Sequence, residues 1–123
     1  MKILLSLFSL SVLLCISCSK QEITVYHAVS YSVTKPAGVQ IDSILYRDAN
    51  EQDLLIIDPP GRVYLLMKVK EGFRAELKVV GNLADSASSL ISISHLNGSG
   101  SATLDEYVSG AGPFEVVLSK IIE

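Results

Sequence analysis

The chain has 123 residues, a formal net charge of −3 and two cysteines. Phosphate binding needs a concentrated basic face, and Glu71 and Glu76 interrupt the one basic run, residues 68–78, so we expect no nucleic-acid partner. Both cysteines lie within the first 18 residues, which excludes a disulfide and a cysteine-ligated metal site from the rest of the chain.

Residues 1–17 have the composition of a helical secretory signal peptide. Lys2 precedes an apolar stretch, Ile3–Ile16, and small Ser17 ends it. A spanning helix would need about 20 apolar residues, and serines interrupt this shorter stretch. A signal for soluble secretion would end in a small-x-small pattern, which Cys15-Ile16-Ser17 matches poorly.

The end of this leader resembles the cleavage box of bacterial lipoproteins. Ser17 and Cys18 match its last two positions, whereas Cys15 would follow bulky Leu14 and fits less well as the acceptor. The resemblance implies that Cys18 becomes the first residue of the mature protein and carries the lipid, and that residues 18–22 form a lipidated tether. Two or three fatty chains are sufficient for stable anchoring in a membrane.

Two short patterns refine this expectation. Residues 19–22, Ser-Lys-Gln-Glu, resemble the signal that directs Bacteroidetes lipoproteins to the outer face of the outer membrane; a periplasm-facing anchor is the alternative. Asp85-Ser86-Ala87 and Asp42-Ser43-Ile44 resemble the O-glycosylation motif of that phylum. Because Ser43 falls in a predicted strand, we prefer Ser86.

Residues 23–123, which follow the tether, show the period-two alternation of β-strands. In Ile23–Val33 the odd positions, His27 among them, form one face that we expect to be buried. Turn residues follow at 35–38 and 58–61, and Asn97-Gly98 suits a tight hairpin. Further strands are predicted at residues 39–46, 54–57, 62–70, 73–83, 88–96, 102–108 and 113–122. We expect loops at 84–86, 99–101 and 109–113, the last two being mobile tips.

This spacing, about seven or eight strands, predicts one domain, an antiparallel immunoglobulin-like β-sandwich. The order of several segments is similar to that in small exported β-sandwich lipoproteins and, distantly, in the outer domain of mycobacterial MmpS proteins, which are accessories to lipid exporters. The segments are Val29–Thr34, Glu71–Phe73, Ile91–Ser94, Asn97-Gly98 and Ser109–Ala111. Gly112-Pro113 departs from that family. The resemblance implies the fold and an accessory role.

No catalytic motif or metal-ligand spacing is present. His27 is in phase with the apolar face of its strand, so we interpret it as a core or edge histidine bonded to backbone; His95 precedes a turn, where we expect it to be solvated. Asp105 and Glu106 should point to opposite strand faces. We therefore predict no enzyme activity, no cofactor and no metal; a hydrolase would need either histidine beside a Ser, Asp or Glu.

Aromatic side chains bear on glycan binding. The sequence contains no Trp, and core packing accounts for the other scattered rings, Tyr26, Tyr46, Tyr64 and Phe114. Glu51 and Asp53 are expected to be solvated. The sequence thus favours a lipid-anchored, non-enzymatic envelope protein that acts through contact with a partner protein. A small-ligand or glycan-binding lipoprotein of an outer-membrane uptake system and an exporter accessory are the alternatives.

Overall fold

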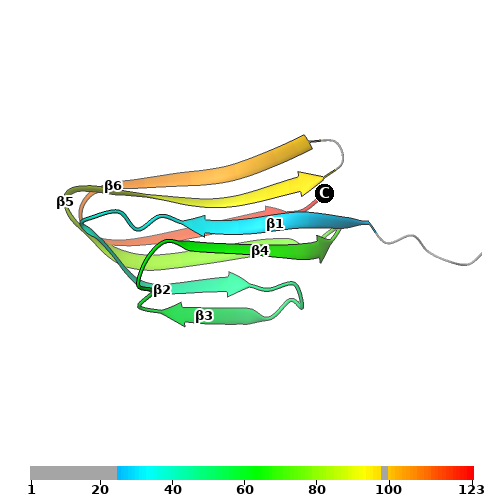
Figure 1. The fold of residues 1–123 in the computed structure, drawn as a ribbon, viewed down its shortest axis with the longest axis horizontal. Coiled ribbons are helices and arrows are strands. Elements are labelled where there is room, and N and C mark those ends of the chain that lie inside the picture. Colours follow the sequence, from blue (N-terminus) through cyan, green and yellow to red (C-terminus); the bar gives the residue numbers. More distant parts are fainter. Residues whose placement is uncertain (1–24, 98–99) are drawn as a thin grey trace, which may run out of the picture.

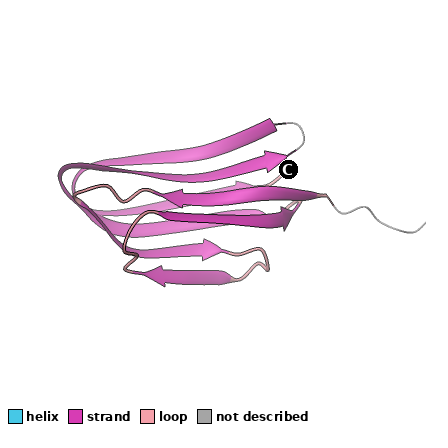
Figure 2. Ribbon diagram, viewed as in Figure 1, coloured by secondary structure: helices cyan, strands magenta, loops and turns pink. Residues whose placement is uncertain are grey.

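The chain forms antiparallel β-strands throughout residues 25–97 and 100–123, the part described by this computed structural model (Figure 1). Within that part there are no helices (Figure 2). Its strands are β1 (Tyr26–Val33), β2 (Val39–Arg47), β3 (Asp53–Ile57), β4 (Val63–Lys70), β5 (Arg74–Asn97) and β6 (Gly100–Ile121). The predicted all-β, antiparallel class is confirmed, while the predicted leader, the tether and Cys18 lie outside the described residues.

One hydrogen-bonded sheet contains all these strands, in the order β3-β2-β5-β1-β4, with β6 paired along β5. The first part of β5, up to residue 83, pairs with β2 and with the second half of β6. Its second part, from residue 87, pairs with β1 and with the first half of β6. The sheet therefore has two arms, a β2 arm that includes β3 and a β1 arm that includes β4.

The sheet curls because all four passages between the two arms lie at one end, on the left in Figure 1. We call this end the bend; its segments are residues 34–38, 58–62, 84–86 and 110–112. In β5, residues 84–86 are opposite Ala111 alone, since Leu83 pairs with Gly112 and Ala87 with Gly110. Extra residues on one strand of a pair bend it and increase its twist. Both glycines have positive φ, 116° and 102°, which other residues rarely adopt.

Hydrogen bonds hold the bend together. The Ala84 N–H donates to the Gly38 carbonyl at 2.8 Å, and Lys35 Nζ donates to the Pro59 carbonyl at 2.7 Å. Ser89, which is buried, donates from its hydroxyl to the Thr34 carbonyl at 2.7 Å. In return, the Leu90 N–H donates to Thr34 Oγ1 at 2.8 Å. These bonds join segment 34–38 of the bend to segments 58–62 and 84–86.

The two arms share one apolar core. Tyr31 of β1 shows the contact between them, because its ring lies 5.9 Å from that of Tyr46 in β2 and its hydroxyl donates to the Arg47 carbonyl at 2.8 Å. The buried apolar residues come from both arms: Val29, Tyr31, Val33, Val39, Ile41, Ile44, Val69, Phe73, Ala75, Leu77, Val79, Leu83, Ala87, Ile91, Ile93, Val116, Leu118 and Ile122.

The strand predictions need two corrections. Two predicted pairs of strands are single long strands, β5 and β6: pairing is interrupted only by the bulge at residues 84–86 and Ala111, so 84–86 and 109–113 are not the loops that were expected. The buried face predicted for the first strand is confirmed for β1, but Val25 before it is 52% exposed. Residues 98–99 of the predicted hairpin turn lie outside the described residues, although Asn97 pairs with Gly100 on either side.

Candidate functional site

The end opposite the bend, called the open end here, contains three of the candidate functional residues, His27, His95 and Glu51. It contains the turns at 48–52 and 71–73, the end of β5, the start of β6 and both ends of the described chain (Figure 1). Hydrogen bonds join these pieces, from the Glu71 N–H to the Val25 carbonyl at 3.4 Å and from the Gly72 N–H to the Ile122 carbonyl at 2.7 Å. The chain therefore enters the sheet at the open end.

Two histidines that are far apart in the sequence meet near this end. β1 and β5 are neighbours, with Val29 opposite His95, and this register places the imidazoles of His27 and His95 in contact, with ring centres 5.9 Å apart and planes at 63°. His27 is 5% exposed. Sequence spacing alone did not reveal the pair, because it depends on strand register.

The ring nitrogens of this pair are buried without partners. Both nitrogens of His27 and Nδ1 of His95 have no hydrogen bond within the described residues. Burial of His27 in the core was predicted, but its predicted backbone bond is absent among the described residues. A buried polar atom left unpaired costs about 1–3 kcal/mol, so such atoms in native structures call for an explanation such as a bound water or ion.

His95, which was predicted to be solvated, is half-buried, and its Nδ1 atom is buried. Desolvation lowers the pKa of its imidazole, and the charges of Lys120 and His27 lower this pKa further. A hydrogen bond to the backbone of Glu123 acts in the opposite direction. The net direction favours the neutral ring, with Nδ1 unpaired.

A cleft of about 430 Å³ leads from solvent to His95. Gly100, Ser101, Ala102, Lys120, Ile121 and Glu123 line it with His95. Among the described residues no group of three His, Cys, Asp or Glu side chains is gathered in the manner of a metal site. The hydrolase alternative required an acid or serine beside a histidine, and Ser101 and Glu123 line this cleft together with His95.

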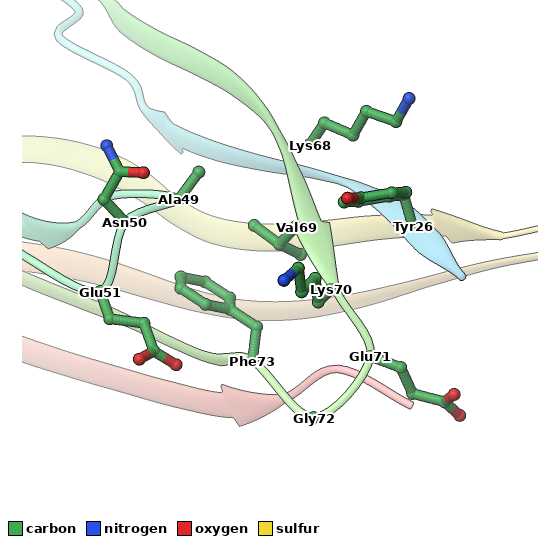
Figure 3. Close-up of a pocket in the computed structure, with 10 residues that line it drawn as sticks. All are labelled: Tyr26, Ala49, Asn50, Glu51, Lys68, Val69, Lys70, Glu71, Gly72 and Phe73. Carbon is green, nitrogen blue, oxygen red and sulfur yellow. The ribbon is translucent and has the colours of Figure 1, made fainter. Parts of the chain in front are cut away.

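A second, larger cleft of about 650 Å³ lies between the 48–52 turn and the end of β4 (Figure 3). Val69 and Phe73 form its inner side, and Glu51 lies across from them. On the outside, Lys68 Nζ lies 4.9 Å from the centre of the Tyr26 ring, a cation–π contact. This cleft combines an aromatic ring, charged groups and an apolar floor.

The aromatic rings are divided between core and surface. Tyr46 and Phe114 pack against the core as predicted, but Tyr26 and Tyr64 are 48% and 55% exposed, so core packing does not account for them. Both side chains lie on the outward face of the β1 arm, because β1 and β4 bury their opposite face.

The remaining predicted residues are on the surface or in strands. Ser86 is exposed, with φ of 62°, in the bend, and Ser43 is half-buried in β2. Asp105 and Glu106 are both exposed in β6, as are Glu51 and Asp53 near β3.

Comparisons with protein families, with curated proteins and with solved structures found no match for this chain. Among the described residues, none belongs to a helix that is long and apolar enough to cross a membrane.

Proposed function

We propose that this chain is a lipid-anchored bacterial envelope protein, held in the outer membrane through Cys18, which acts without catalysis by contact with a partner protein. The single observation that carries this proposal is the box ending in Ser17-Cys18, seven residues before the first described residue, Val25. An extended chain spans at most about 3.6 Å per residue, so this tether reaches about 25 Å. The open end would then lie nearest the bilayer.

The contact role is supported by the exposed edge of the β2 arm. β3 pairs with β2 on one side only, and its apolar side chains Leu55 and Ile57 are 56% and 71% exposed. Leu45, opposite Leu55 on β2, extends the apolar surface. An exposed apolar edge strand can accept a further strand from another chain. We propose this edge as the partner-binding surface.

We further propose that the curled sheet is a β-sandwich, since its two arms face each other across one core. Its immunoglobulin-like character stays a prediction. For Ser86 we propose O-glycosylation, because it is exposed in the bend while Ser43 is half-buried in a paired strand. Mass spectrometry of the protein from its native host should find the glycan lost in Ser86→Ala and kept in Ser43→Ala.

Labelling with radioactive palmitate tests the anchor. Cys18→Ala should abolish incorporation, whereas the matched variant Cys15→Ala should keep it, because only Cys18 follows a small residue. Equal labelling of Cys18→Ala and the parent would refute the anchor. Protease treatment of intact cells then separates surface display from a periplasm-facing position.

Site-specific photo-crosslinking in cells tests the partner surface. A photoreactive residue at Ile57 should give a discrete crosslinked product, while one at Tyr107, a 72% exposed side chain on β6, serves as the control. Equal products from both positions would contradict a partner at the β3 edge.

Small-ligand or glycan binding is the second candidate, favoured by the cleft that Tyr26 and Lys68 border. Aromatic rings stack on sugar faces, and their loss weakens such binding. Screening the chain and Tyr26→Ala against a glycan array tests it: binding that is lost in Tyr26→Ala supports this function, and a parent chain that binds no glycan refutes the glycan form of it.

A further inference from the structure

The outward face of the β1 arm combines basic, aromatic and aliphatic side chains. Along β4, every second residue packs against the core and the residues between them are exposed. The outward side chains of β1 and of the second part of β5 continue this surface, since both strands pair with their neighbours in register. We call its large exposed residues the basic face: Tyr26, Arg62, Tyr64, Leu66, Lys68, Lys70 and Leu96.

The charge of this face differs from that of the whole chain. The sequence has a formal net charge of −3. In contrast, the outward positions of β1, of β4 with Arg62, and of β5 from residue 88 to 96 carry basic side chains and no acidic one. Glu71, in the turn after β4, and Asp105, opposite Ser92 on β6, border the face. A local basic surface on an acidic chain attracts anionic partners.

Two cation–π contacts pair the aromatic rings of this face with its cations. Lys68 Nζ lies 4.9 Å from the centre of the Tyr26 ring, and the Arg62 guanidinium carbon lies 5.7 Å from the centre of the Tyr64 ring. Tyr64 is opposite Ser32, so the two contacts are separated by the length of β1 from residue 26 to residue 32, about 20 Å. The basic face therefore extends from the open end towards the bend.

These types of side chain match the interfacial zone of an anionic bilayer. Tyr rings lie at the level of the lipid headgroups, Lys and Arg bind the phosphates, and Leu enters the acyl boundary. Leu66 and Leu96, 66% and 57% exposed, offer nothing to a sugar, and a cation lies over each Tyr ring. The chain also enters β1 beside Tyr26, so a tether of about 25 Å would let this face reach the membrane.

We propose that the basic face docks on a bilayer surface that contains anionic lipid. This inference rests on the proposed anchor only because the anchor would bring the chain to the membrane. β4 and β3 are at opposite ends of the strand order, so docking through the β1 arm leaves the β3 edge free for a partner protein.

A polarity-sensitive fluorophore on the full chain tests the docking. With Cys15→Ser and Cys18→Ser, a cysteine introduced by Leu66→Cys is the single labelling site. The chain is reconstituted through its apolar leader into vesicles of phosphatidylcholine, alone or mixed with phosphatidylglycerol, and flotation selects the bound chain. We expect the emission to shift to shorter wavelength on the anionic vesicles only. High salt should reverse the shift, because it screens the attraction.

Val117→Cys on the same background is the matched labelling control. Val117 is 61% exposed in β6, opposite Lys78 on the outward face of the β2 arm, and its label should show no shift. Equal shifts at the two positions would overturn the proposal, since they would show contact with lipid without a preferred face.

Lys68→Gln combined with Lys70→Gln removes two cations of the basic face. Each cation near an anionic surface changes a membrane-binding equilibrium about fivefold, so the ratio of docked to undocked chain should fall about 25-fold. Arg74→Gln combined with Lys78→Gln is the matched control, because it removes the same charge from exposed positions of the β2 arm, and it should keep the ratio. Equal losses from the two pairs would reduce the effect to net charge and overturn the proposal.

Failure of the docking and failure of the anchor are distinguishable. Cys18 is replaced in the vesicle experiment, so docking can succeed even if palmitate labelling fails. A label at position 66 that reports water on both kinds of vesicle would overturn the docking while the anchor stands, and would favour an acidic protein as the partner of this face.

Discussion

The carbonyl oxygen of Gln40 occupies the space that a side chain at Gly81 would need. A Cβ on Gly81 would collide with this backbone oxygen and would lie 2.8 Å from the Phe114 ring. β2 and β6 thus converge on either side of β5 at this position, where Ile41 and Phe114 are the register partners of Gly81. The close packing of β2 against β5 therefore requires glycine at position 81.

Gly81→Ala should therefore destabilise the protein by about 3 kcal/mol or more, because overpacking here moves backbone and not a flexible side chain. Gly61→Ala is the matched control, since nothing lies within 4 Å of its added Cβ. Denaturant unfolding of both variants measures the difference. Equal stabilities would contradict the close approach of β2 to β5.

Tyr31→Phe should change the response to alkaline pH. Burial raises the pKa of the Tyr31 hydroxyl from 10.0 to about 12, so the folded state holds this proton more tightly than the unfolded state does. This contribution to stability is complete below pH 10 and is lost as the pH rises towards 12. The variant should lose about 1 kcal/mol at neutral pH, for the hydrogen bond to Arg47, and decline less steeply in that window. Unfolding free energies across the pH range give both values; parallel curves for variant and parent would contradict the prediction.

Ser89→Ala should weaken the bend. The Ser89 hydroxyl donates to the Thr34 carbonyl from a position that is 1% exposed, so its removal leaves this carbonyl with one bond fewer. We expect a loss of about 1–2 kcal/mol. Ser88→Ala, one residue away on the exposed face, should change stability by less than about 0.5 kcal/mol. Thermal unfolding compares the two, and similar losses from both would refute a structural role for the Ser89 hydroxyl.

Ile57→Lys should reduce self-association without loss of stability. Ile57 is 71% exposed on the edge strand β3, and a charge on an edge strand opposes pairing with another chain. Sedimentation at rising protein concentration should show less association than in the parent, with an unchanged melting temperature. A variant that associates as strongly as the parent would show that the chain does not associate through the edge strand β3.

Much of the local structure could be predicted from residue patterns. The alternation of His27, Val29 and Tyr31 identified the buried face of β1, and the breakers at 35–38 and 58–61 identified two of the passages between the arms. The passages at 84–86 and 110–112 were mistaken for loops between separate strands. Glycine and small polar residues are common both in loops and in strand bulges, and only pairing distinguishes them.

The candidate site shows the same division. The sequence by itself determined the all-β class of the fold, through period-two alternation, and it carries the prediction of membrane anchoring, through the box that ends at Cys18. Only the tertiary structure decided that His27 and His95 meet, that their nitrogens lack partners among the described residues, and that β3 ends the sheet as an apolar edge. The physical reason is that alternation fixes which face a side chain takes, whereas strand order and register, set by packing across the whole core, fix which side chains become neighbours.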